Sequence, residues 1–295
     1  MPPSDLLALV NGQIVPVASP ALAALDRGLL YGDGLFETIR AYDGVPFLLE
    51  AHIERLNRSA AELRICDGLD PAGLHRDVDA LLERNGLRDA YVRITLTRGF
   101  HTGALVLEET EEPTVCVVVR PLHLPPPERY EPGTRCVVAS WRRSAQSPIL
   151  RHKTLNYLEN LAARSEAVER GADDAIFLNT RGEVAEATSS NVFLVLGGKL
   201  VTPHLGANIL PGVTRAQVIA LARGMGMEVE EREVWAYEFR GADEVFLTNS
   251  VAEILPVREV EGRAVGAGRP GPVTRRLQSA YREAVTAYIV GGENE

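Results

Sequence analysis

Lysine is scarce in this chain, and one of its lysines stands where it could act as a nucleophile. The 295 residues include 31 lysines and arginines, of which only Lys153 and Lys199 are lysines. Arginine stays protonated, whereas a buried lysine can lose its proton and attack a carbonyl carbon. Lys199 follows Gly197-Gly198 in a predicted hairpin turn, while Lys153 opens an apolar segment with a helical period. Lys153 is therefore the candidate for imine chemistry, and an ordinary surface lysine in an arginine-biased chain is the alternative.

A lysine that forms an imine with pyridoxal phosphate needs a carboxylate for the ring nitrogen and a partner for the ring hydroxyl. Glu186 suits the first role, because it ends a short predicted strand and has small neighbours that let a ring approach. Tyr157 suits the second role, because it follows Lys153 by one turn of a predicted helix. A solvated turn carboxylate and a core tyrosine are the alternatives for these two residues.

The phosphate of such a cofactor needs a cup of hydrogen-bond donors. Val213 and Thr214 follow Gly212 where a helix is predicted to begin, and free backbone N–H groups at a helix start bind phosphate. Ser250, in a small polar turn after a strand, and the guanidinium of Arg55 could add donors. Simple helix capping by Thr214 and a surface ion pair of Arg55 are the alternatives.

A proline-rich stretch divides the elements that must position these residues. We expect a small α/β domain over residues 1–120, an interdomain linker over 121–133, and a larger domain over 134–295 that carries the lysine. In the first domain we expect a hairpin over 6–17, a glycine-rich loop over 26–34 feeding a strand, helices over 50–65 and 71–85, and strands over 91–97 and 114–120.

The second domain is predicted to be strand-rich, with packed helices. We expect strands over 135–141, 175–179, 183–186, 191–196, 200–203, 228–234, 244–248 and 254–257, and helices over 153–170, 209–224 and 272–289. The fold class is therefore α+β or α/β with two domains, the second of them arranged as a pseudo-barrel.

Composition excludes several classes of protein. The net charge of −9 and the lack of a basic stripe argue against nucleic-acid binding. The three cysteines are far apart, with no CxxC pair or Cys/His cluster, so we expect reduced thiols and no metal. The first residues show no basic stretch followed by an apolar core, and no apolar run reaches membrane-spanning length. We therefore expect no signal peptide, no membrane segment and a cytoplasmic location.

The order of six motifs resembles that of the class IV, fold-type IV pyridoxal-phosphate enzymes. This family includes branched-chain aminotransferases, D-amino acid aminotransferases and aminodeoxychorismate lyases. The resemblance extends from the Asn11-Gly12 hairpin to Val257. The matching pieces are Asp26-Arg27-Gly28 with Gly32-Asp33-Gly34, His52-Ile53-Glu54-Arg55-Leu56, Lys153-Thr154-Leu155-Asn156, Glu186 with Ser190-Asn191-Val192-Phe193, Leu210-Pro211-Gly212-Val213-Thr214-Arg215, and Asp243-Glu244-Val245-Phe246.

The resemblance implies the two domains named above, with pyridoxal 5′-phosphate between them. It also implies a homodimer in which the neighbouring subunit partly roofs each site. By position, Lys153 resembles the Schiff-base lysine and proton shuttle, and Glu186 resembles the partner of the ring nitrogen. Arg55, Val213, Thr214 and Ser250 resemble the phosphate cup. Tyr157 resembles the tyrosine of the branched-chain group, which has one more residue between the lysine and its Asn-Tyr pair.

The resemblance leaves the substrate open, because the motifs mix features of the subgroups. Residues 36–42 look like the branched-chain enzymes, whereas Gly32-Asp33-Gly34 and Thr97-Arg98-Gly99 look like the other two groups. We expect transamination between an amino acid and a 2-keto acid, of branched-chain or D-amino acid type. The alternatives are a lyase that makes 4-aminobenzoate and pyruvate, and a non-catalytic cofactor-binding protein. The candidate substrate-binding residues are Tyr31, Phe36, Arg40, Tyr91, Arg93 and Arg98.

Overall fold

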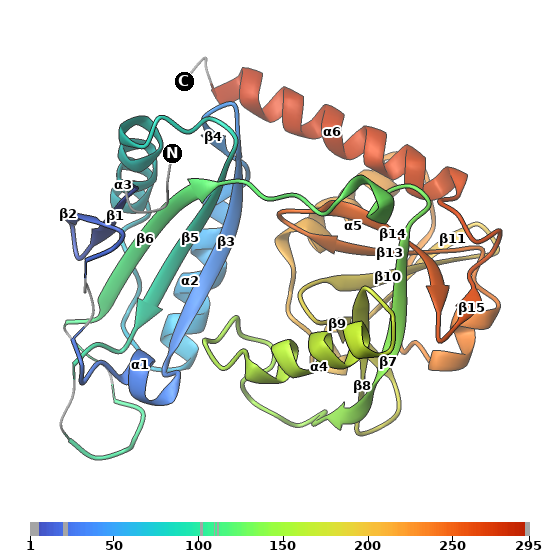
Figure 1. Cartoon of the computed structure of the whole chain (residues 1–295), viewed down its shortest axis with the longest axis horizontal. Coiled ribbons are helices and arrows are strands. Elements are labelled where there is room, and N and C mark those ends of the chain that lie inside the picture. The colour runs from blue at the N-terminus through green and yellow to red at the C-terminus, as the bar shows by residue number, and fades with distance from the viewer. Residues whose placement is uncertain (1–5, 20–22, 101–102, 109, 111, 293–295) are drawn as a thin grey trace. The chain divides into compact units, whose positions relative to one another are not determined.

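The chain divides into two compact units, which Figure 1 shows in a computed structural model. The structure describes residues 6–19, 23–100, 103–108, 110 and 112–292. Unit 1 comprises Met1–His123, His152–Asn156 and Val285–Glu295, and unit 2 comprises Leu124–Arg151 and Tyr157–Ala284. The expected division at 121–133 therefore assigns two later segments, His152–Asn156 and Val285–Glu295, to the second domain, whereas they belong to unit 1. Lys153 lies in unit 1, contrary to the expectation that the larger domain carries it.

Unit 1 is built on an antiparallel sheet of six strands in the order β2-β1-β6-β5-β3-β4. The strands are β1 (Leu7–Val10), β2 (Gln13–Pro16), β3 (Gly34–Tyr42), β4 (Val45–Pro46), β5 (Ala90–Thr97) and β6 (Thr114–Pro121). The expected strands agree with these bounds to within one residue at each end. The alternation is clearest in β5, where buried and partly buried side chains alternate from Ala90 to Leu96.

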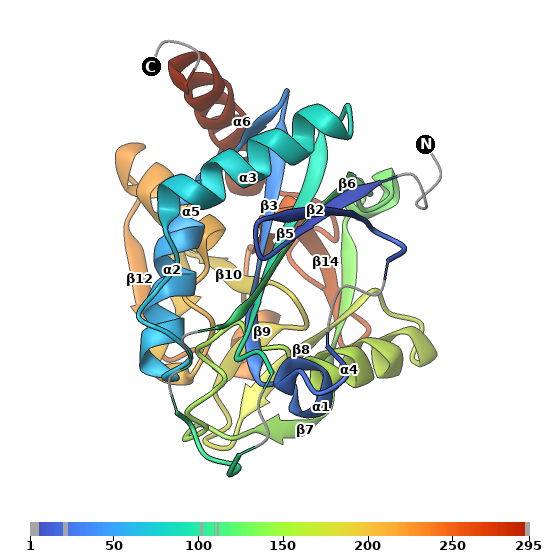
Figure 2. The same cartoon turned by 90° about the vertical axis from the view of Figure 1, so that its left-hand side faces the viewer.

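Two helices cover one face of this sheet, as Figures 1 and 2 show. They are α2 (Leu49–Glu62) and α3 (Pro71–Arg84), and their apolar stripes pack on Leu35, Ile39 and other inward residues of the strands. The predicted glycine-rich loop instead contains a short helix, α1 (Arg27–Tyr31). It forms because the Asp26 side chain accepts a bond from Gly28 N, and because Gly32 ends the helix in the left-handed region at φ 67°.

Unit 2 is built on a mixed sheet of nine strands in the order β12-β11-β10-β13-β14-β7-β8-β9, with β15 beside β14. The strands are β7 (Thr134–Arg143), β8 (Asp174–Asn179), β9 (Val184–Ala187), β10 (Asn191–Leu196), β11 (Lys199–Pro203), β12 (Val229–Arg232), β13 (Glu244–Asn249), β14 (Glu253–Val260) and β15 (Arg263–Ala264). The sheet curls on itself, and this is seen from its end strand β9, which contacts β10 near the other end of the strand order. The expected pseudo-barrel is confirmed.

The helices of unit 2 begin close to where their patterns predict, with one exception. They are α4 (Leu158–Glu169), α5 (Val213–Gly224) and α6 (Pro272–Gly292), with short 3₁₀ turns η2 (Pro127–Arg129), η3 (Leu205–Ala207) and η4 (Ala236–Arg240). The exception is α4, which was expected to begin at Lys153. No helix in the described part of the chain is long and apolar enough to cross a membrane.

The segment His152–Asn156 is extended because it pairs with the start of β3. Phe36 N donates to Lys153 O at 2.9 Å, and Leu155 N donates to Gly34 O at 3.0 Å. Gly34 permits this approach, since a Cβ there would lie 2.8 Å from Leu155 Cδ1 and 2.6 Å from Leu96 O. Backbone bonds to a distant strand thus override the helical period of this segment.

The start of α6 depends on one carboxylate of β13. Glu244 is buried, and its side chain accepts bonds from Val273 N at 2.9 Å and from Thr274 N and Oγ1 at 2.7 and 2.6 Å. We expect Glu244→Ala to lower the free energy of unfolding by about 1–3 kcal/mol, because three donors, two of them in buried hydrogen bonds, lose their acceptor. Urea unfolding can measure this change. Glu283→Ala, on the same helix, serves as the control, and an equal loss in the two variants would contradict the capping role.

Candidate active site

The amine of Lys153 lies against the aromatic ring of Phe36. Its Nζ is 4.5 Å from the ring centroid, a distance at which the ring attracts a cation. The backbone bond from Phe36 N to Lys153 O fixes the same two residues to each other. The position of the amine therefore depends directly on β3.

On the opposite face of the sheet, β3 carries a buried ion cluster. Arg55 Nε and Nη2 donate to the two carboxylate oxygens of Glu37 at 2.8 and 2.5 Å, and His52 Nδ1 lies 2.8 Å from Oε2. Burial raises the pKa of Glu37, but the Arg55 charge and the bonds from His52 and Arg55 outweigh it and lower the pKa to about 2. Two donors of Arg55, the predicted phosphate ligand, are thus held by Glu37.

Four of the six predicted substrate residues share the face of the unit 1 sheet that lies away from α2 and α3. Phe36 and Arg40 lie an even number of residues apart on β3, and so do Tyr91 and Arg93 on β5, so each pair shares a face. Arg40 pairs directly with Tyr91, which places the two pairs on the same face. The guanidinium carbon of Arg93 lies 3.9 Å from the Phe36 ring centroid. The Lys153 amine is at this same ring, so the reactive nitrogen and two cations share one face.

The other two predicted substrate residues are placed differently. Arg98 is buried and uses all five of its N–H donors within unit 1, on Asp33 and on the carbonyls of Leu63, Arg64 and Glu108. Since a guanidinium has only five such donors, the predicted contact of Arg98 with substrate is wrong for this arrangement. Tyr31 is 53% exposed at the end of α1.

In unit 2, Glu186 is a buried carboxylate at the centre of a set of donors. Arg143 Nη1 donates to its Oε1 at 3.1 Å, and Leu210 N and Asn191 Nδ2 donate to its Oε2 at 3.1 and 3.4 Å. Every one of these partners donates, so each favours the ionised carboxylate. An anion held in this way is suited to stabilise a protonated pyridine nitrogen.

Arg143 is a functional candidate that sequence reasoning missed. Its Nε donates to Glu159 at 3.0 Å, its guanidinium carbon lies 3.5 Å from the Phe177 ring centroid, and its Nη2 is buried without a hydrogen-bond partner among the described residues. The sequence offers two adjacent arginines at the end of β7, and only strand alternation distinguishes the buried Arg143 from its neighbour Arg142.

The predicted phosphate cup begins at an uncapped helix start. Gly212 precedes α5 and provides no side-chain cap, while Ala216 N is bonded to Gly212 O at 3.0 Å. The amides of Val213 and Thr214 therefore have no acceptor inside the helix. A Cβ on Gly212 would lie 2.1 Å from Asn191 Oδ1, so only glycine fits here. Asn191 thus contacts both the start of α5 and Glu186.

The turn after β13 adds hydroxyl groups to unit 2. Thr248 pairs with Asn191 in the sheet, and its Oγ1 is buried with no hydrogen-bond partner among the described residues. Ser250 follows in a turn that Asn249 holds by accepting bonds from Val251 N at 2.9 Å and Ala252 N at 2.7 Å. Uncapped helix amides and an orphaned buried hydroxyl are the kind of donors that a phosphate group requires.

Tyr157 does not follow Lys153 by a helical turn, since the helix starts only at Leu158. Its hydroxyl donates to Thr188 O at 3.0 Å, and Asn160 Nδ2 donates to the same oxygen at 2.6 Å. Thr188 follows the strand that carries Glu186. Tyr157 is thus held near the end of β9, and its predicted role at the ring hydroxyl stays a prediction.

The Glu37 cluster predicts a pH-dependent stability. The pKa is about 2 in the folded protein, against 4.5 for a free side chain, so the unfolded chain binds the proton first as the pH falls. Glu37 should therefore contribute about 3 kcal/mol above pH 4.5 and lose this contribution between about pH 4.5 and 2. At pH 7, Glu37→Gln should destabilise the fold by about 3–5 kcal/mol, because the buried Arg55 loses the carboxylate that binds two of its nitrogens.

Urea unfolding at several pH values can measure the gap between Glu37→Gln and the parent, which should shrink as the pH falls below 4.5. Glu54→Gln, at an exposed position of α2, should give a small and nearly constant difference. A gap for Glu37→Gln that stayed constant down to pH 3 would contradict the assigned pKa shift.

Comparison with known proteins agrees with this geometry. Residues 34–260 match the family described as Amino-transferase class IV. A putative branched-chain-amino-acid aminotransferase of Methanocaldococcus jannaschii is 38% identical over 95% of this chain and 96% of its own. A D-alanine aminotransferase of Bacillus licheniformis is 34% identical, over 94% and 96% of the two chains. An aminodeoxychorismate lyase of Bacillus subtilis is 35% identical, over 95% of each.

Solved structures show the same fold. The branched-chain amino acid aminotransferase of Escherichia coli superposes with a TM-score of 0.90 and 32% identity, covering 95% of this chain and 94% of its own. The T.th. branched-chain enzyme in complex with N-(5′-phosphopyridoxyl)-L-glutamate gives a TM-score of 0.88 and 32% identity, covering 96% and 95%. The expected fold class and cofactor, pyridoxal phosphate, are confirmed. The chain belongs to the class IV aminotransferases.

Proposed function

We propose that this protein transfers the amino group of L-branched-chain amino acids and L-glutamate to 2-keto acids. The observation that carries the proposal is the Lys153 amine at the Phe36 ring, on a sheet face that also presents Arg40 and Arg93. Two arginines on this face suit the carboxylates of an amino acid or a 2-keto acid. Glutamate is included because the similar T.th. enzyme binds a phosphopyridoxyl derivative of it.

Lys153 has the central role in this reaction. Pyridoxal phosphate, when bound, would supply a carbonyl group that reacts with an amine and a ring that withdraws electrons from the substrate. Lys153 Nζ would take the proton from the α-carbon of the amino acid and pass it to the carbonyl-derived carbon of the cofactor, and it would move a proton in the opposite direction when the 2-keto acid is converted. Arg40 and Arg93 orient the substrate, and Phe36 and Tyr91 contact its apolar part.

The remaining site residues bind and polarise the cofactor. Glu186, held ionised by Arg143, Asn191 and Leu210 N, stabilises the protonated ring nitrogen. The amides of Val213 and Thr214, the hydroxyl of Ser250 and the guanidinium of Arg55 bind the phosphate. Tyr157 supports the ring hydroxyl.

The second candidate function is release of pyruvate from aminodeoxychorismate. It is supported by the 35% identity with the Bacillus subtilis lyase over 95% of both chains. The same lysine could serve either reaction, because both begin by removing the α-proton of an amino acid bound to the cofactor. The two candidates therefore differ in substrate and product rather than in the role of Lys153.

A half-reaction with the purified holoenzyme distinguishes these functions. We expect L-leucine, L-isoleucine, L-valine and L-glutamate each to convert the pyridoxal absorbance to that of pyridoxamine. Lys153→Ala should slow this conversion by roughly 10²–10⁴-fold, because the proton-transfer group is lost. Lys199→Ala removes the only other lysine, which pairs with Glu228 and Glu230 at the surface, and should keep the parent rate.

Other outcomes reassign the function. Conversion by D-alanine or D-glutamate alone would reverse the assigned chirality. Pyruvate release from aminodeoxychorismate, with no conversion by any amino acid, would establish the lyase. A Lys153→Ala protein with the parent rate would exclude the proposed role of this lysine.

We further propose that the protein is a homodimer whose contact surface includes α1. Leu29, Leu30 and Tyr31 of this helix are 63%, 46% and 53% exposed. Leu105, in the loop region between β5 and β6, is 71% exposed. Arg27 Nη1 donates to Ala104 O at 3.4 Å, so the helix and this loop region lie together. Contiguous exposed apolar side chains are typical of a protein interface.

Light scattering after size-exclusion chromatography tests the dimer. We expect the parent to elute with the mass of two chains, and Leu29→Glu combined with Leu105→Glu to shift the protein toward one chain, because two charges would be buried at the contact. Val168→Glu, at an exposed site of α4, should leave the mass unchanged. A monomeric parent, or a dimeric double variant, would contradict this surface assignment.

A further inference from the structure

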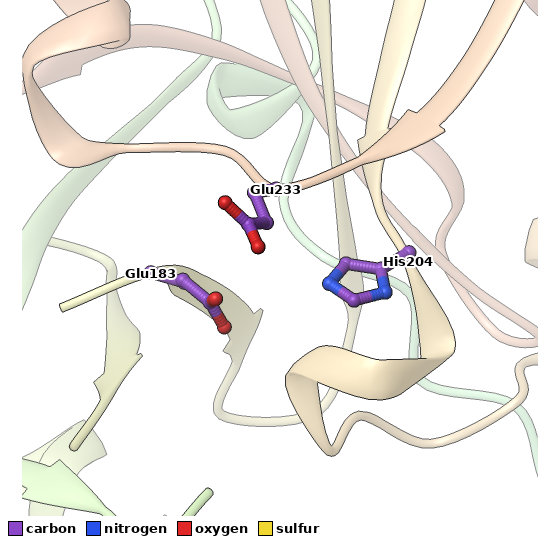
Figure 3. Close-up of side chains that lie close together, drawn as sticks. All are labelled: Glu183, His204 and Glu233. Carbon is purple, nitrogen blue, oxygen red and sulfur yellow. The ribbon is translucent and has the colours of Figure 1, made fainter. Parts of the chain in front are cut away.

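Three potential metal ligands that are far apart in the sequence meet in unit 2, as Figure 3 shows. They are Glu183, just before β9, His204, just after β11, and Glu233, just after β12. One nitrogen or oxygen atom from each side chain lies within 4.8 Å of the others. In Figure 3 the imidazole and the two carboxylates point toward a common space. These residues are separate from those assigned to the aminotransferase reaction.

The imidazole of His204 has an unsatisfied nitrogen at this point. Its Nε2 is buried and has no hydrogen-bond partner among the described residues. A buried nitrogen without a partner is unfavourable, and here it stands beside two groups that can only accept hydrogen bonds when ionised. The backbone of His204 is fixed, because its N donates to Arg232 O at 3.1 Å and its O accepts from Ala207 N at 2.9 Å. A cation would satisfy all three side chains.

Glu183 is buried and partly neutralised, but it retains an open acceptor position. Asn179 Nδ2 and Arg181 Nη2 donate to its Oε2 at 2.6 and 2.7 Å, and Arg181 Nε donates to its Oε1 at 2.9 Å. These bonds use three of the four lone-pair positions of the carboxylate and leave one on Oε1. The charges of the two carboxylates and Arg181 sum to one negative charge, which favours a cation.

We propose that His204 Nε2, Glu183 and Glu233 bind one divalent transition-metal ion, such as Zn²⁺. Imidazole and carboxylate ligands suit this class of ion, and three protein ligands plus water complete a tetrahedral zinc site. Ligand atoms around zinc lie roughly 3–3.5 Å apart, and the three atoms here, all within 4.8 Å of one another, need only a small movement to reach that spacing. Glu233 is exposed and can rotate to achieve this. The bound ion joins the start of β9, the strand that carries Glu186, to the ends of β11 and β12.

The expectation of no metal site rested on the lack of a CxxC pair or a Cys/His cluster in the sequence. In this cluster the ligands are brought together by the sheet: β11 runs beside β12, and Glu183 forms an isolated bridge with Trp235, close to Glu233. Only the strand pairing shows that these three residues are neighbours.

Calorimetric titration of the tag-free holoenzyme with Zn²⁺ at pH 7.5 tests the proposal. We expect one saturable ion per chain, and at least about tenfold weaker binding in His204→Asn and in Glu233→Gln. His123→Asn removes an exposed histidine elsewhere and should bind as the parent does. In the parent, Zn²⁺ should also raise the midpoint of thermal unfolding, whereas in His204→Asn it should not.

Gly206→Ala is a variant that keeps all three ligands. A Cβ at this position would lie 2.6 Å from His204 Cε1 and 2.8 Å from Nδ1, so the imidazole must move away. We expect zinc binding to weaken while the absorbance of the cofactor stays that of the parent. The absence of a saturable site in the parent would overturn the proposal, and so would parent-like affinity in His204→Asn. Either result would mean that this cluster does not hold the metal ion.

Discussion

Two backbone hydrogen bonds between β3 and the segment His152–Asn156 determine where the reactive amine lies. They join Phe36 N to Lys153 O and Leu155 N to Gly34 O. One residue of β3 therefore provides both a backbone bond to the lysine and the ring against which its amine lies. The next residue, Glu37, points to the opposite face, where Arg55 of α2 binds it. A shift of register by one residue would exchange these faces and separate the amine from the arginine-bearing surface.

Three ion pairs in which one arginine binds both oxygens of a carboxylate give a physical reason for arginine rather than lysine at these positions. Glu37 is bound by two nitrogens of Arg55, Asp33 by two of Arg98, and Glu183 by two of Arg181. A planar guanidinium can bind both oxygens of a carboxylate at once, which an ammonium group cannot do with the same geometry. Lysine could replace arginine at such positions only with loss of a bond. Lys153 differs under the proposed function, because an amine that attacks a carbonyl carbon must be able to lose its proton.

The sequence predicted the elements with a clear local pattern and the residues whose chemistry is distinctive. Side-chain period and residue type predict the strands of unit 1, the helices α2 and α3, and the buried carboxylate of Glu186. The extended conformation at Lys153 could not be predicted in this way, because it depends on bonds to β3, more than a hundred residues earlier in the chain. Arg143 was missed for the same reason, since its role depends on contacts with Glu159 and Glu186.

A comparison of two arginines shows most clearly which property of a site cannot be predicted from nearby sequence: the hydrogen-bond partners that a side chain finds in the fold. Arg93 and Arg98 lie on or directly after the same strand, and both were expected to bind substrate. Strand alternation places Arg93 beside Phe36, on the face that the Lys153 amine shares. Arg98 lies beyond the end of β5, where Asp33 and three backbone carbonyls use all of its donors. Residue type indicates that a guanidinium can bind a carboxylate. Whether it can bind one on a substrate depends on how many of its N–H donors already bond to the protein, and only the structure shows this. For this reason the expected contact of Arg98 with substrate does not fit this structure, whereas the expected contacts of Arg40 and Arg93 stay predictions.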